Sequence, residues 1–125
     1  SVSKFSSISS IRKFLVTKQR LLTKNKNIIM IGRDIGTVVV PNAKFKFYLN
    51  ASSYVRAKRR YDQTKIKYKS IEEIKKSIDL RDKIDSTRKD SPLIPAKDAM
   101  IIDTDNLSLL EVVDKMYNVF IGENL

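Results

Sequence analysis

The chain alternates amphipathic helical segments with short apolar runs. Apolar residues at steps of three and four predict helices over residues 5–24, 52–61 and 70–88, and a last helix that begins at Ser108. Capping boxes, in which a serine is followed three residues later by a glutamate, mark the starts of the last two helices, at Ser70 and Ser108. In the last helix, we expect these apolar side chains to point inward: Leu109, Leu110, Val113, Met116 and Phe120.

Three short apolar runs predict β-strands. They lie at residues 28–31, 44–49 and 100–103, and the first leads into a turn over residues 32–37. Because strands alternate with helices, the sequence predicts an α/β fold with a short parallel sheet flanked by helices.

The composition is that of a single globular domain. Of the 125 residues, 42% are hydrophobic and 31% are charged, and no apolar run approaches the roughly 20 residues that cross a bilayer. We therefore expect a cytoplasmic protein that does not interact with membranes. The chain has no cysteine and no histidine, which removes the usual metal ligands and the usual general base. Any chemistry must use arginine, lysine, aspartate and serine.

The net charge of +11 predicts an anionic partner, such as a nucleotide, a nucleic acid or an acidic membrane surface. Two simpler explanations are a general lysine bias on a solvated surface and the absence of an acidic portion. The chain begins with serine rather than methionine, and we expect it to be a piece of a longer or split protein.

Two segments carry arginine and aspartate where a packed core would exclude them. Residues 32–39 follow the first predicted strand, at a strand end where open α/β sheets bind ligands. In residues 81–88, Arg81, Asp85 and Arg88 continue the isoleucine stripe of the long helix at steps of four and three. The simpler interpretation is an ordinary ion pair between residues i and i+4. Alternatively, the two arginines, about 10 Å apart along the axis, converge on one nucleotide phosphate.

Residues 32–41 and 81–93, read in order along the chain, closely resemble the bacterial cytidylate kinase family. Supporting matches lie at residues 51–60, 95–99 and 102–108. The resemblance implies a partial P-loop nucleoside monophosphate kinase fold with a helical lid. It also implies transfer of the γ-phosphate of ATP to CMP or dCMP, giving CDP or dCDP, with Mg²⁺ bound together with ATP. The chain resembles only the C-terminal part of that family.

The resemblance also implies a role for particular residues. It assigns base reading to Ser3, Arg12 and Asp34, and the chemistry agrees, because a carboxylate accepts from the cytosine amine whereas arginine and serine donate to ring acceptors. The acceptor nucleotide would be held through its phosphate and sugar by Arg33, Arg81, Asp85 and Arg88. Of these, Arg33, Arg81 and Arg88 would also be catalytic, by neutralising charge. Arg59 and Arg60 stand at the start of the family's lid and would bind ATP phosphates.

The same resemblance divides the chain and defines what it lacks. We expect a core α/β part over residues 1–61 with the base- and acceptor-binding side, a lid-like helical segment over 62–91, and a core strand with the C-terminal helix over 92–125. The glycine-rich phosphate loop G-x-x-x-x-G-K-[ST] is absent from the sequence. An N-terminal segment with that loop is therefore an expected partner. Ile31 occupies a position where the family has a metal-facing aspartate, so we predict no dedicated metal site here.

Two other functions remain open at this point. The first is a non-catalytic remnant, or one half of a split enzyme, that binds a cytosine nucleotide or a partner chain. The second is a basic RNA-binding module, which the net charge alone suggests. The sequence lacks the glycine and aromatic motifs typical of RNA-binding folds, so we do not expect nucleic acid as a partner.

Overall fold

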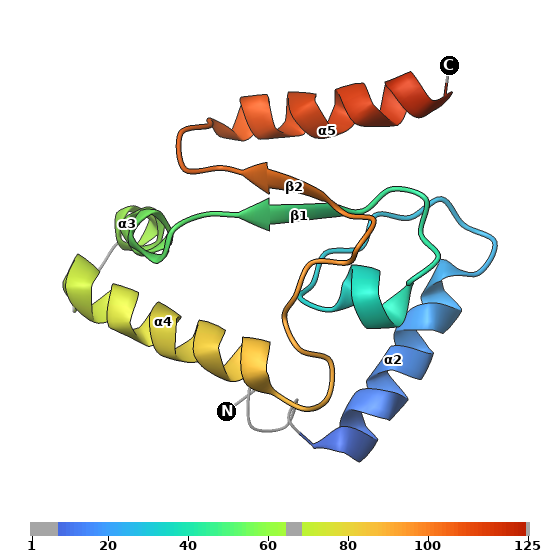
Figure 1. The fold of residues 1–125 in the computed structure, drawn as a ribbon, viewed down its shortest axis with the longest axis horizontal. Helices are drawn as coiled ribbons and strands as arrows, with labels where there is room; N and C mark the ends of the chain where they lie inside the picture. The colour runs from blue at the N-terminus through green and yellow to red at the C-terminus, as the bar shows by residue number, and fades with distance from the viewer. Residues whose placement is uncertain (1–7, 65–68, 125) are drawn as a thin grey trace.

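The computed structural model describes residues 8–64 and 69–124 (Figure 1). The elements, in chain order, are α2 (Ser9–Thr23), the π-helix η1 (Ile35–Val39), β1 (Phe47–Asn50), α3 (Ser53–Gln63), α4 (Ile71–Thr87), β2 (Met100–Asp103) and α5 (Leu109–Asn124).

The two strands form a short parallel sheet. Phe47 pairs with Met100, and the register continues to Asn50 and Asp103. One further bond lies beyond the last pair, where the Thr104 amide donates to the Asn50 carbonyl at 2.8 Å. Parallel strands need a long crossover connection, and α3 and α4 lie within it. The predicted α/β class, with a short parallel sheet flanked by helices, is confirmed.

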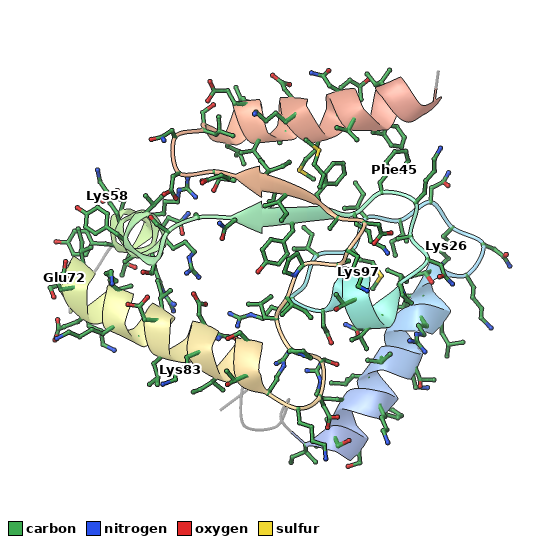
Figure 2. All side chains as sticks on the ribbon, in the orientation of Figure 1. Lys26, Phe45, Lys58, Glu72, Lys83 and Lys97 are labelled. Atoms are coloured by element: carbon green, nitrogen blue, oxygen red, sulfur yellow. The ribbon has the colours of Figure 1, made fainter. Side chains whose placement is uncertain are left out.

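Helices lie on both sides of the strand pair. In Figure 1, α5 runs along the side of β2, whereas α4, η1 and α2 lie on the side of β1. Phe45, in the segment before β1, lies beside α5 (Figure 2), and its ring centroid is 5.1 Å from that of Phe120. α2 lies next to η1 (Figure 1), and Arg33, two residues before η1, pairs with Asp85 near the end of α4, which joins segments far apart in the sequence.

The buried apolar core is small. Its described members are Val39, Ala57, Ile102 and Val112. The inward face predicted for the last helix is wrong for four of its five residues, because Leu109 and Leu110 are mostly exposed and Val113 and Phe120 are about half exposed. Val112 is buried instead, since the face of α5 that meets the rest of the described chain differs from its most apolar face.

The strand predicted over residues 28–31 is absent. Ile29 and Ile31 are 89% and 95% exposed, and no described strand pairs with this segment. A strand is stabilised by hydrogen bonds to a neighbour, so an apolar run without one stays irregular. The turn expected over residues 32–37 gives way to η1 at Ile35.

The predicted helix starts are confirmed by their caps. The Ser70 amide donates to the Glu73 carboxylate at 2.7 Å and the Glu73 amide to Ser70 Oγ at 3.2 Å. Ser108 and Glu111 exchange the same pair of bonds. Ser52 caps α3 by accepting from the Val55 amide. The predicted helices are otherwise placed within two residues of the observed ends, except that α2 begins at Ser9, and residues 5–7 lie outside the described part.

Candidate functional site

The segment that carries Arg33 and Asp34 is held by a tight backbone turn. A Cβ atom at Gly32 would lie 2.7 Å from Cγ1 of Ile35, so any larger residue here would displace the Ile35 side chain. The Asp34 carbonyl accepts from the amides of Val38 at 2.9 Å and Val39 at 3.2 Å, which begins η1. The Asp34 carboxylate takes no part in this cap and is directed to a different partner.

That partner is Arg12 of α2. The guanidinium Nη2 of Arg12 forms an ion pair with Oδ2 of Asp34, and the two side chains are only 12% and 13% exposed. A shielded pair of this kind is held more firmly than a surface ion pair. The structure thus brings together two of the three residues predicted to read the base, and Ser3, the third, lies outside the described residues.

Three arginines converge on the carboxylate of Asp85. This residue is buried near the end of α4, with 6% of its surface exposed. Its Oδ2 pairs with Nη1 of Arg33 and lies 3.7 Å from Nε of Arg81. Its Oδ1 lies 3.4 Å from Nη1 of Arg88. We call Arg33, Arg81, Asp85 and Arg88 the arginine cluster. The ion pair expected between residues i and i+4, Arg81 and Asp85, is therefore present. It belongs to a larger group, however, because Arg33 from a distant segment meets the same carboxylate.

The loop after α4 fixes Arg88. The Arg88 Nε donates to the Ser91 carbonyl, and the Leu93 amide donates to the Asp85 carbonyl at 2.8 Å. Ser91 itself has φ of 52°, a left-handed conformation that few residues other than glycine adopt. Because these bonds join the loop to the helix end, Arg88 stays on the Asp85 side of α4. Lys83, by contrast, projects to the outside of the molecule (Figure 2).

The cluster keeps an excess of positive charge. Three arginines against one aspartate leave a formal charge of +2. Burial and then the positive charge of Arg81 lower the pKa of Arg33, and burial and then Arg12 lower the pKa of Arg88. Guanidinium groups nevertheless stay charged near neutral pH. The site is thus suited to bind an anion with several oxygen acceptors, of which phosphate is the typical case.

The two arginines predicted to bind ATP phosphates lie elsewhere. Nη1 of Arg59 donates to Oγ1 of Thr104 at 2.9 Å, and its Nη2 donates to the Thr104 carbonyl. Arg59 thereby joins α3 to the end of β2. Arg60 is exposed on the same helix. The structure places Arg59 with Thr104 rather than with the arginine cluster.

Two further arginines make contacts that the sequence does not predict. Arg56 of α3 binds Asp82 of α4 through both Nη atoms, one of them at 3.1 Å, and this hydrogen bonding raises the pKa of Arg56. Arg20 of α2 donates to two carbonyls at the end of η1. Neither contact has a sequence signal, because the partners are 18 to 26 residues apart and two of them are backbone carbonyls.

Two negative observations concern the described residues only. No group of three or more histidine, cysteine, aspartate or glutamate residues is placed to hold a metal ion in residues 8–64 and 69–124. Within the same ranges, every helix is too short or too polar to cross a membrane.

Comparison with known proteins decides the family. The sequence model of the cytidylate kinase family matches residues 1–121. The chain belongs to the cytidylate kinase family. The resemblance seen in residues 32–41 and 81–93 is thereby confirmed.

Curated relatives of the cytidylate kinase family agree. The chain is 47% identical over 120 residues to a cytidylate kinase from Clostridium botulinum (strain Okra, type B1), covering 94% of this chain and 55% of the relative. It is 49% identical over 122 residues to one from Caldanaerobacter subterraneus, covering 93% and 53%. It is 50% identical over 115 residues to one from Fusobacterium nucleatum, covering 90% and 53%. The chain thus spans about half the length of the curated relatives it matches.

Proposed function

We propose that this chain forms the acceptor-binding part of a kinase that transfers the γ-phosphate of ATP to CMP or dCMP, giving CDP or dCDP. The observation that carries the proposal is the convergence of Arg33, Arg81 and Arg88 on buried Asp85. The formal charge of +2 on the arginine cluster balances the two negative charges of a phosphate monoester dianion. Catalysis in phosphoryl transfer is largely positioning and charge neutralisation, which arginines supply without histidine or cysteine.

The base would be recognised by the Arg12–Asp34 pair next to the cluster. In the proposed complex, the Asp34 carboxylate accepts from the exocyclic amine of cytosine, while Arg12 and Ser3 donate to the ring acceptors. Uracil has a carbonyl at that position, whose oxygen would face the Asp34 carboxylate with no hydrogen to donate. Leaving a buried acceptor without its partner is a strong source of discrimination. The sugar would lie between these two sets of residues, within reach of Asp85 and Arg81.

Mg²⁺ is implied by the family, but the acidic residues of the site do not suit it. Asp34 is paired with Arg12, and Asp85 with the three arginines. Carboxylates that are already neutralised by arginine are poor ligands for a hard cation. We therefore expect Mg²⁺ to enter with the ATP phosphates and to find no dedicated ligands in this part of the protein.

The ATP side would be completed by a second segment. The exposed Ile29 and Ile31 lie directly before the site, and the chain spans about half the length of its relatives. We propose that a partner segment bearing the glycine-rich phosphate loop covers these isoleucines. Arg59 and Arg60 would then reach ATP phosphates, which requires Arg59 to exchange its bonds to Thr104 for bonds to phosphate.

A second function is favoured by one observation. The chain has only three glycines and no phosphate loop of its own, so it is also suited to bind a cytosine nucleotide, or a partner chain, without catalysis.

The kinase assay separates these functions. We expect ATP-dependent formation of CDP from CMP only when the chain is mixed with a segment that carries the phosphate loop. No CDP in either case would overturn the kinase proposal. A chain that binds CMP but never forms CDP in the mixture supports the non-catalytic alternative. Asp34→Ala should reduce CMP affinity in calorimetry by about five- to 150-fold, because a buried polar contact is worth roughly 1–3 kcal/mol.

A further inference from the structure

Arg20 makes an unusual contact with the end of η1. Its Nε donates to the Val39 carbonyl at 2.8 Å, and its Nη2 donates to the Val38 carbonyl at 2.6 Å. The last carbonyls of a helix have no donors within the helix, and a positive charge at that end is favourable. Val39 is among the most buried residues of the described chain, so this contact attaches Arg20 to a fixed point.

The same helix also holds the other end of η1. Arg12 lies eight residues before Arg20 on α2, about 12 Å along the helix axis, and it pairs with Asp34, the residue that precedes η1. The Asp34 carbonyl accepts from the amides of Val38 and Val39, whose carbonyls accept from Arg20. The backbone that Arg20 fixes is therefore bonded directly to Asp34.

We propose that Arg20 is a positioning residue for base recognition. By fixing the end of η1 against α2, it sets the position of Asp34 relative to Arg12, although it touches neither carboxylate nor base. The inference rests on the proposed function, in which Arg12 and Asp34 contact cytosine. A planar guanidinium suits this task because it bridges two successive carbonyls, whereas a lysine ammonium is a single point of charge.

The first test measures the turn itself in the full chain without nucleotide. Arg20→Gln should speed hydrogen exchange at the amides of Val38, Val39 and Val40, which carry the η1 bonds, and leave the amides of α5 unchanged. Lys13→Gln removes the same charge from an exposed position on the same helix and is the matched control. Equal exchange at these three amides in Arg20→Gln and Lys13→Gln would overturn the inference.

The second test measures base selectivity by calorimetry with CMP and with UMP. Arg20→Gln should lower the ratio of CMP to UMP affinity by about tenfold, chiefly through weaker CMP binding, and Arg20→Lys should lower it less. Lys13→Gln should keep the wild-type ratio. A purely structural role would lower the melting temperature without changing this ratio. Arg20→Lys retains the charge, so it provides the comparison if Arg20→Gln is poorly folded.

The outcomes separate the inference from the proposed function. A wild-type chain with no preference for CMP over UMP would overturn the proposed function, and this inference with it. A wild-type preference that is fully kept in both Arg20 variants would overturn the inference alone.

Discussion

Asp85 is the residue on which the arginine cluster depends, because its carboxylate faces three guanidinium groups that would otherwise repel one another. We expect Asp85→Asn to lower the free energy of unfolding by about 1–3 kcal/mol, through uncompensated positive charge. This loss of stability is smaller than that expected for a fully buried ion pair, because the side chains of Arg33 and Arg81 are 37% and 55% exposed. Urea unfolding in a phosphate-free buffer measures the change.

The same variant tests whether the cluster is an anion site. Inorganic phosphate should stabilise Asp85→Asn more than the wild type, because the anion takes the place of the missing carboxylate and binds only the folded state. Asp79→Asn, on the same helix, removes an exposed carboxylate paired with Lys75. It should change neither the free energy of unfolding nor the stabilisation by phosphate by much. If the two variants behave alike with phosphate, the cluster is not an anion site.

Among the elements, α4 carries the phosphate-binding side of the proposed site, and its start is fixed by the capping box. Ser70→Ala should destabilise the protein by about 1 kcal/mol, as loss of an N-cap hydroxyl usually does. Thermal unfolding at neutral pH measures this loss. Ser86→Ala, an exposed serine of the same helix outside the capping box, is the control and should have a much smaller effect.

The capping boxes also give a pH dependence. Hydrogen bonds from Ser70 and from Ser108 hold the pKa values of Glu73 and Glu111 below their ordinary value. Because these pKa values are lowered in the folded state, the stabilisation by the two ionised glutamates is fully present above the ordinary glutamate pKa. It is lost as the pH falls through the pKa values of the folded protein. In amide exchange, the first turns of α4 and α5 should therefore lose protection below about pH 4. Protection that stays constant to pH 2 would contradict this.

Local patterns predicted much of the fold. The capping boxes located the starts of α4 and α5, and the apolar run at residues 100–103 is β2. The spacing of Arg81 and Asp85 placed both on one face of α4, and Arg88, directly after the helix end, meets Asp85 as well. Each of these features depends on residues within one or two turns of each other, so sequence spacing contains the necessary information.

Features that depend on distant partners were not predictable in this way. The segment 28–31 has the composition of a strand, but a strand also needs a neighbour, and composition does not report one. The spacing of charges does not reveal that Arg33 meets Asp85 or that Arg56 meets Asp82. Arg20 was missed because its partners are backbone carbonyls, which every residue has.

For the whole molecule, charge and apolar exposure point to two kinds of partner. The net charge of +11 suits a nucleotide, and the arginine cluster holds part of it in one place. The apolar side chains of Ile29, Ile31, Leu109 and Leu110 are largely exposed, which is more than an isolated domain usually leaves to solvent. This exposure supports the proposal made above that a second segment packs on the chain.

Ile31→Ser tests that expectation at a position beside the site. Because the side chain is 95% exposed, the substitution should change the stability of the chain alone by less than about 0.5 kcal/mol. It should nevertheless weaken binding of a segment that carries the phosphate loop by about tenfold or more, since burying an isoleucine contributes roughly 1.5–3 kcal/mol. Leu80→Ser, at an exposed position of α4, is the control for both measurements and should leave segment binding unchanged. Equal segment affinity for the two variants, measured by calorimetry or by the CDP yield of the mixture, would mean that the partner segment does not cover Ile31.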